Sequence, residues 1–124
     1  MNVPQISIAA QPEYLPEESD PAQNRYAFAY HISIRNTGQI AAQLIARHWL
    51  ITDANNAVQE VRGLGVIGYQ PLLQPGESFE YSSGCILETP VGTMQGSYQM
   101  MTVDGQPFDA PIAEFVLTIP RVLH

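Results

Sequence analysis

The sequence predicts an all-β fold, a sandwich of the immunoglobulin or fibronectin type III kind with about seven antiparallel strands. Two observations predict it. Ten prolines and nine glycines recur along the 124 residues and leave little room for long helices. Between them, apolar and polar residues alternate with a period of two, as in strands with one buried face. The length fits one domain, residues 1–124, with a core of its own.

The first half of the chain predicts three strands after a short first one. A strand is expected around Ile6 and Ile8. Residues 10–24, rich in proline and acidic residues, are expected to form a surface loop or an edge crossing, with Tyr14 and Leu15 turned inward. Residues 25–36 predict a long strand with an aromatic and aliphatic face. Residues 43–52 carry apolar residues on both faces, which is typical of a central strand covered on each side. A turn at Asp53-Ala54-Asn55-Asn56 then leads to a short strand, residues 58–62.

The second half begins with a long connection, residues 63–76, which is rich in glycine and bounded by proline. Residues 78–87 then predict a strand with Phe79 and Tyr81 on one face. Residues 93–103 predict another, with its larger apolar residues in step (Met94, Tyr98 and Met100), and Asp104-Gly105 is a strong turn signal. Residues 112–119 predict the last strand, in which three apolar residues alternate with their neighbours (Phe115, Leu117 and Ile119).

Charge and cysteine content exclude several classes of protein. The net charge is −7, and all five basic residues are arginines, which disfavours binding to nucleic acid because few cations can displace counterions from phosphates. The single cysteine, Cys85, excludes an internal disulfide and reads as a small buried side chain. The sequence shows no signal peptide and no apolar run of membrane-spanning length, so we expect a cytoplasmic protein without a membrane partner.

No set of residues indicates catalysis, a metal or a cofactor. The chain has no G-x-S-x-G string, and Ser82-Ser83-Gly84-Cys85 has no base beside it. His31 and His124 have no neighbouring ligands at metal-binding spacing. The sequence therefore predicts a protein that is not an enzyme. Arg47 and Trp49 share one face of their strand, which suggests a cation–π or stacking pair.

Residues 63–68 read Gly-Leu-Gly-Val-Ile-Gly, a G-x-G-x-x-G string. In dinucleotide-binding folds these glycines let backbone amides approach a pyrophosphate at a helix N-terminus, but the prolines and glycine that follow leave no room for a helix. The glycines therefore favour positive-φ positions in a loop. A nest of amides beside the cation of Arg62 stays open as the alternative, with Arg62, Gly63, Gly65 and Gly68 binding pyrophosphate.

The connection is also unusually apolar for a loop, with Leu64, Ile67 and Tyr69 among its residues. Such a loop either packs over an open end of the sandwich or forms a recognition patch, in which case these three residues bind a protein partner. The edge strands of an open sandwich can also pair across a two-fold axis, so a homodimer stays open as well.

Several strings together resemble the ApaG family, over nearly the whole chain. They are Tyr26-Ala27-Phe28-Ala29-Tyr30, Arg47-His48-Trp49-Leu50-Ile51-Thr52-Asp53, residues 60–71 from Glu60 to Pro71, Pro75-Gly76 and Gly92-Thr93-Met94-Gln95-Gly96-Ser97-Tyr98. The resemblance implies a fibronectin type III-like sandwich, no enzymatic activity, and a small cytoplasmic protein. It also implies an association with cobalt and magnesium efflux, whose mechanism must be indirect in a chain without a membrane segment or soft-metal ligands.

The resemblance extends to domains at the C-terminus of eukaryotic F-box and polymerase-interacting proteins, which implies protein binding. Bacterial members have a gene that neighbours one for a diadenosine tetraphosphate hydrolase. Pyrophosphate or nucleotide binding is implied for the glycine string, which corresponds here to Gly63, Gly65 and Gly68. The leading hypothesis is therefore a non-enzymatic protein-interaction module. The alternative is a loop at residues 63–68 that binds a pyrophosphate-containing nucleotide, with ATP, GTP and diadenosine tetraphosphate as the candidates.

Overall fold

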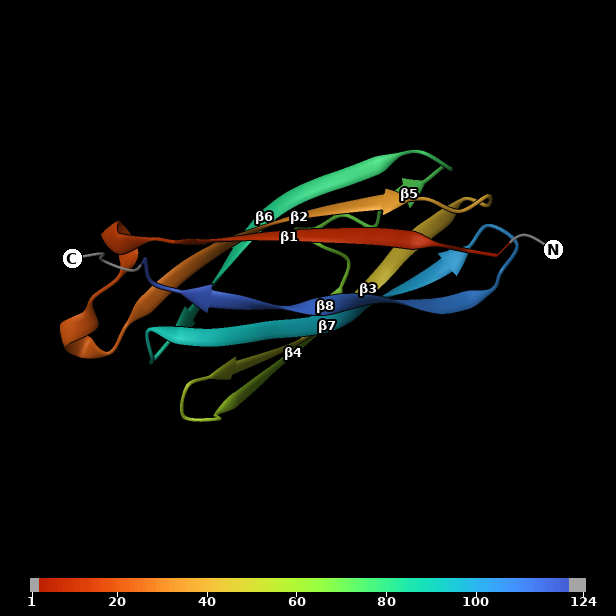
Figure 1. The fold of residues 1–124 in the computed structure, drawn as a ribbon. Helices are drawn as coiled ribbons and strands as arrows, with labels where there is room; N and C mark the ends of the chain where they lie inside the picture. Colours follow the sequence, from red (N-terminus) through yellow and green to blue (C-terminus); the bar gives the residue numbers. More distant parts are fainter. Residues whose placement is uncertain (1–2, 121–124) are drawn as a thin grey trace.

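Two antiparallel β-sheets pack face to face and contain almost all of the regular structure (Figure 1). The computed structural model describes residues 3–120. Its strands are β1 (Ile6–Tyr14), β2 (Tyr26–Asn36), β3 (Ala42–Asp53), β4 (Val58–Leu64), β5 (Leu72–Leu73), β6 (Ser78–Leu87), β7 (Val91–Thr102) and β8 (Pro107–Thr118). Two 3-10 turns, η1 (Pro16–Glu18) and η2 (Pro21–Gln23), connect β1 to β2. The predicted sandwich is confirmed.

The order of the strands leaves one side of the sandwich open. One sheet has the order β1-β2-β6 and the other β4-β3-β7-β8, and β5 pairs with the start of β3. The edge strands β1 and β8 contact each other, which closes one side. On the other side the edges are β4 and β6 (Figure 1). Among residues 3–120 no helix is long and apolar enough to cross a membrane.

The core between the sheets is aromatic and centres on Trp49 of β3. Its ring centroid lies 5.5 Å from that of Tyr30, 6.2 Å from that of Tyr98 and 6.0 Å from that of Phe115. These distances are those of favourable tilted and edge-to-face pairs. Inward-facing residues predicted from the alternation in β2 and β7 are buried in this core (Phe28, Tyr30, Ile32, Ile34, Met94, Tyr98 and Met100).

The predicted loop at residues 10–24 is wrong for its first part. Strand β1 continues through Pro12 to Tyr14, and Tyr14 lies opposite Phe28 in the ladder with β2. Pro12 is tolerated because β1 is an edge strand, where a missing N–H can face away from the sheet. The ring of Tyr14 packs 5.4 Å from that of Phe28, as the sequence suggested for this residue.

The expectation that β3 is covered on both faces is also wrong. Its pairing with β7 shifts between Leu44 and Ala46, a β-bulge at Ile45. A bulge inserts one residue and changes which alternate positions face inward. Leu44 and Trp49 are therefore both buried, although their positions differ by an odd number and strict alternation would place them on opposite faces. The bulge therefore explains why buried apolar residues occupy both even and odd positions of β3. The strand is central within its own sheet, as predicted.

Two other strands are longer than predicted. Strand β4 continues through Gly63 to Leu64, so the connection after it is shorter and contains the two-residue β5. Strand β8 begins at Pro107 and includes Pro111. Prolines lowered the strand signal there, but β8 is an edge strand and accommodates them.

Candidate functional site

The segment after β4 forms a tight hairpin turn. Val66 and Tyr69 exchange two backbone hydrogen bonds, with N···O distances of 2.8 and 2.9 Å. The residues between them, Ile67 and Gly68, have φ of +43° and +84°. Two central residues with positive φ are the hallmark of a type I′ turn. Strand β5 comes next, so the helix that a dinucleotide-binding fold needs after G-x-G-x-x-G does not follow here.

The hairpin divides the apolar residues of this connection into two groups. Val66 and Leu73 are buried in the core. In contrast, Leu64, Ile67, Tyr69 and Leu72 are 75%, 54%, 61% and 48% exposed. These four residues are called the apolar loop surface below. The ring of Tyr69 lies 6.0 Å from that of Phe79 in β6, so the exposed side chains stand on a supported turn.

Each of the three glycines proposed for pyrophosphate binding has a structural reason to be glycine. Gly65 and Gly68 have positive φ, as predicted. A Cβ at Gly65 would lie 2.3 Å from the carbonyl oxygen of Tyr69, across the hairpin. Gly63 lies within β4 instead, opposite Arg47, and a Cβ there would lie 2.7 Å from a guanidinium nitrogen of Arg47.

The backbone amides of the hairpin are largely engaged. Gly65 donates its N–H to the carbonyl oxygen of Ile45 at 2.8 Å, and the amides of Val66 and Tyr69 bond each other's carbonyls. In the part of the chain that the structure describes, the amides of Ile67 and Gly68 make no backbone hydrogen bond. Those two amides are therefore the ones available to an anion at this loop.

Arg62 lies on the outer face of its sheet, away from the core. Its side chain is 69% exposed, and its Nε lies 3.3 Å from Oε1 of Glu60. The other carboxylate oxygen of Glu60 lies 3.2 Å from Nε2 of His48, an ion-pair distance without the alignment of a hydrogen bond. His48 and then Arg62 hold the pKa of the Glu60 carboxyl below its ordinary value. Glu60 thus offsets part of the positive charge that the sequence places beside the loop.

Arg47 has a different partner from the one that its sequence position suggests. Its Nη1 donates to the carbonyl oxygens of Leu64 and Gly65, at 3.0 and 2.9 Å. The guanidinium therefore holds the start of the hairpin, and the absence of a side chain at Gly63 leaves room for it. Trp49, on the same face of β3, makes its ring contacts with other aromatic residues.

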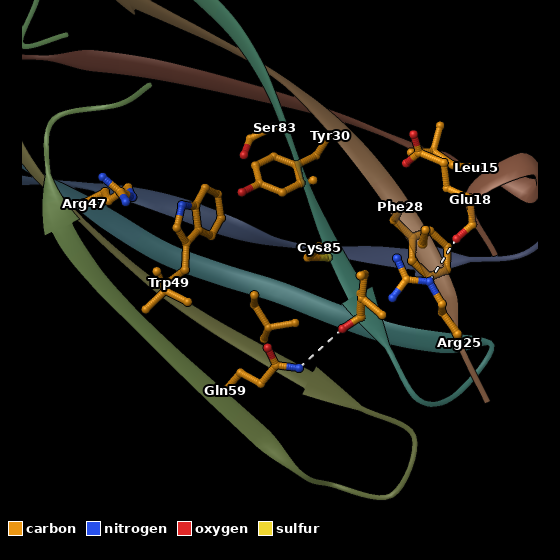
Figure 2. A pocket seen from close by; sticks show the side chains of 15 residues that line it. Leu15, Glu18, Arg25, Phe28, Tyr30, Arg47, Trp49, Gln59, Ser83 and Cys85 are labelled. Carbon is orange, nitrogen blue, oxygen red and sulfur yellow. Dashed lines mark hydrogen bonds between the residues drawn. The ribbon is translucent and has the colours of Figure 1, made fainter. Parts of the chain in front are cut away.

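The open side of the sandwich contains a cleft of about 490 Å³ (Figure 2). Its inner wall is formed by buried aromatic residues of β2 and β3, and its mouth lies between β4 and β6. Figure 2 shows Arg47 and Trp49 at one end and Arg25 and Glu18 at the other. The amide of Gln59 in β4 reaches across the mouth to the carbonyl oxygen of Ile86 in β6, at 3.4 Å.

Tyrosine hydroxyl groups lie near the Arg47 end of this cleft. Tyr30 of β2 and Ser83 of β6 line it, and they lie opposite each other in the ladder between these strands. Behind them in the core, the hydroxyl groups of Tyr81 and Tyr98 lie 2.5 Å apart. Burial raises the pKa of Tyr81 to about 12 and also raises that of Tyr98. These hydroxyl groups are therefore neutral hydrogen-bonding groups at physiological pH.

The free cysteine also lines the cleft. Cys85 is half-buried, and burial raises the pKa of its thiol to about 11. The thiolate is the reactive form of cysteine, so this side chain is a weak nucleophile at neutral pH. Because the thiol lines the cleft, the slow rate at which it is alkylated should fall when a ligand fills the cleft.

A second cluster of polar side chains lies on the exposed face of the smaller sheet. Nδ1 of His31 lies 2.9 Å from Oγ of Ser82, and Nε2 lies 3.1 Å from Oε1 of Glu80. The sequence shows no partner beside His31, because these residues meet only through the pairing of β2 with β6. His124, the other histidine without neighbouring ligands, lies outside the described residues. Among residues 3–120, no three potential metal ligands lie together.

Sequence reasoning missed the cleft, although part of its signal was present. Alternation in β2 and β3 places Tyr30 and Arg47 on inward faces, and an inward arginine is an unusual residue for a core. What the alternation does not reveal is that β4 and β6 form the open side. Ser83 and Cys85 therefore carried no sign that they share a cleft with Arg47.

The comparisons with known proteins agree on one family. A model for the ApaG domain matches residues 16–102. Protein ApaG of Thiobacillus denitrificans is 65% identical over 120 residues, which cover 97% of this chain and 94% of that protein. Protein ApaG of Aromatoleum aromaticum is 64% identical, with coverage of 96% and 94%.

The fold agrees with that assignment. The crystal structure of the putative ApaA protein from Bordetella pertussis matches with a TM-score of 0.93 and 56% sequence identity, covering 96% of this chain and 97% of that one. Its strands thus follow the same path as the two sheets described above. Because the family model covers more than half of the chain and these relatives are at least 56% identical over nearly its whole length, the chain belongs to the ApaG family.

Proposed function

We propose that this ApaG domain is a non-enzymatic protein-interaction module whose partner binds the apolar loop surface. The observation that carries the proposal is the exposure of Leu64, Ile67 and Tyr69 on a hairpin that holds Ile67 at φ +43°. A β-branched residue at positive φ costs about 1–2 kcal/mol, and such strain is concentrated at functional sites. Contact with a partner explains why an apolar side chain is retained in an exposed and unfavourable position.

The partner we propose is a protein that presents an apolar surface to the hairpin. The association with cobalt and magnesium efflux that the family resemblance implies would then run through this partner, in the cytoplasm, rather than through metal binding by this chain. A second copy of the chain is one protein of this kind, and the oligomeric state distinguishes it from a different partner.

Affinity capture with matched variants tests this function. The double variant Leu64→Asp, Ile67→Asp adds charge to the apolar loop surface, and Val58→Asp adds charge to a residue of β4 that is 58% exposed but lies outside that surface. We expect wild type and Val58→Asp to recover the same partner and the double variant to lose it. If the folded double variant recovers the same set of proteins, the loop is not the interface.

Sedimentation of the same three proteins addresses a homodimer. If the partner is a second copy, wild type and Val58→Asp are dimeric and the double variant is monomeric. If wild type is monomeric at concentrations well above those in the capture experiment, the partner is a different protein.

The alternative function is binding of a pyrophosphate-containing nucleotide at the hairpin. It is supported by the exposed guanidinium of Arg62 and by the two unengaged amides of Ile67 and Gly68. Titration calorimetry with ATP, GTP and diadenosine tetraphosphate at low salt tests it. Binding heat that disappears in Arg62→Ala supports this function. The absence of heat, or heat that Arg62→Ala leaves unchanged, contradicts it.

A further inference from the structure

The cleft between β4 and β6 is separate from the apolar loop surface and is built differently. Its lining includes the buried aromatic residues Phe28, Tyr30 and Trp49. The aliphatic residues Val61 of β4 and Ile86 of β6 also line it and are more exposed. Its volume of about 490 Å³ lies in the range of pockets that hold small organic molecules. An apolar cleft with a few polar groups at its ends is the usual construction of such a pocket.

The charge of Arg47 has no counter-ion in the part of the chain that the structure describes. The ion pairs there involve Glu60 and Glu80, and neither of them pairs with Arg47. A guanidinium has five N–H donors, of which the two on Nη1 can account for the bonds to Leu64 and Gly65. The remaining donors, on Nε and Nη2, form the edge of the guanidinium that can donate two parallel hydrogen bonds to a carboxylate or phosphate.

The lining as a whole favours an anion although the protein is acidic. Arg47 and Arg25 line the cleft together with a single acidic residue, Glu18, so the formal charge of the lining is 2 − 1 = +1. Glu18 lies at the end away from Arg47, where its carbonyl oxygen accepts a hydrogen bond from Nε of Arg25 at 3.1 Å. Tyr30 and Ser83 supply hydroxyl groups toward the Arg47 end (Figure 2).

We propose that this cleft binds a small organic anion with a flat, apolar body. The anionic group pairs with the guanidinium of Arg47, and the body lies against the aromatic inner wall between β4 and β6. The class of ligand is an aromatic acid, whether its anionic group is a carboxylate or a phosphate. Because Arg47 also holds the carbonyls of Leu64 and Gly65, the ligand would bind next to the start of the hairpin.

A matched pair of probes tests the class of ligand. The two molecules 2-naphthoate and 2-naphthamide have nearly the same shape, and only the first carries a charge. Binding is followed by amide chemical shifts and by the rate at which iodoacetamide alkylates Cys85, which lines the cleft. We expect 2-naphthoate to bind about tenfold more tightly than 2-naphthamide, because a charged hydrogen-bonded pair adds to the apolar contact. We also expect 2-naphthoate to slow alkylation.

Three variants locate the site. Arg47→Gln removes the charge but keeps a donor for the hairpin. The affinity of this variant for 2-naphthoate should therefore fall to that for 2-naphthamide. Arg35→Gln removes the same charge from an exposed position outside the cleft, and should leave the tenfold difference intact. Val61→Trp fills the mouth and should abolish protection of Cys85 by either probe, a result that does not depend on Arg47.

The proposal is overturned if the two probes bind wild type equally or if neither binds at millimolar concentration. It is also overturned if Arg47→Gln binds 2-naphthoate as tightly as wild type does. If Arg47→Gln does not fold, the same outcome for Val61→Trp overturns it. Shifts confined to the outer face of either sheet contradict it too. The capture result for the apolar loop surface is independent, because no residue of that surface lines the cleft.

Discussion

Gly96 lies in β7, in the ladder with β3. It is opposite Trp49 in the ladder, and a Cβ at this position would lie 2.0 Å from the carbonyl oxygen of His48. Gly105 is different, because it has φ of +89° and no atom within 4 Å of such a Cβ. The first glycine is required by packing and the second by backbone conformation alone.

Alanine at these two positions therefore separates the two effects. We expect Gly96→Ala to lower the free energy of unfolding by at least about 3 kcal/mol, because backbone must move to relieve the overlap. Gly105→Ala should lower it by about 1 kcal/mol, the cost of positive φ for a residue with a side chain. Urea unfolding followed by the fluorescence of the single tryptophan measures both. Equal losses would mean that the sheet shifts at Gly96 without cost.

At the scale of elements, the 66–69 hairpin is the one that departs from its usual sequence. The first central residue of a type I′ turn is most often Asn, Asp or Gly, and here it is Ile67 at φ +43°. Ile67 is more than half exposed, so its side chain adds little to the core.

Replacement of Ile67 by the preferred residue should stabilise the fold while it removes part of the apolar loop surface. We expect Ile67→Asn to raise the free energy of unfolding by about 1 kcal/mol, because Asn tolerates positive φ. The urea midpoint measures the gain, and the capture experiment with the same protein measures the loss of partner. A decrease in stability would show that the Ile67 side chain packs on the hairpin more than its exposure indicates.

The strands differ in how well the sequence predicts them. Strand β2 has uninterrupted alternation from Tyr26 to Ile34, and its buried face is the one predicted. Strand β3 has a bulge at Ile45. Its pattern of apolar residues fits either a bulge or a strand buried on two faces, and the sequence does not distinguish them. Strands β1 and β8 contain prolines, which are turn signals in the chain but are tolerated at sheet edges. Whether a strand lies at an edge depends on which strands pair, and so it is decided by tertiary structure.

At the scale of the whole molecule, buried acids with raised pKa values decide how stability depends on pH. Burial raises the pKa of Cys85 from 9.0 to about 11 and that of Tyr81 from 10.0 to about 12, and it raises those of Tyr30 and Tyr98 as well. A raised pKa means that the folded state binds the proton more tightly than the unfolded state. This stabilisation is fully present below the unfolded pKa values and is lost as pH rises through the folded ones.

The free energy of unfolding should therefore stay level near neutral pH and fall between about pH 9 and pH 12. Urea midpoints across this range measure the decline. Cys85→Ala removes the group that titrates first, so its decline should begin at higher pH than that of wild type. A stability that is unchanged up to about pH 11 would contradict the buried, neutral state of these groups. On the acid side, the lowered pKa of Glu60 acts with the opposite sign, and its exposure makes the effect small.

The sequence by itself determined the class of fold, most of the strands and the location of the glycine-rich connection after β4. Alternation and turn residues are local signals, and they specify which face of β2, β6 or β7 is buried. The sequence also identified Leu64, Ile67 and Tyr69 as apolar residues in a loop.

Tertiary structure decided what those residues do. Packing buried Val66 and Leu73 but left Leu64, Ile67 and Tyr69 exposed, a division that the sequence does not show. The order of the strands leaves β4 and β6 unpaired, and the cleft lies between them. Tertiary structure also places the carbonyls of Leu64 and Gly65 where Arg47 can donate to them. The physical reason is that edges, clefts and counter-ions depend on contacts between residues far apart in the chain, for which local periodicity carries no information.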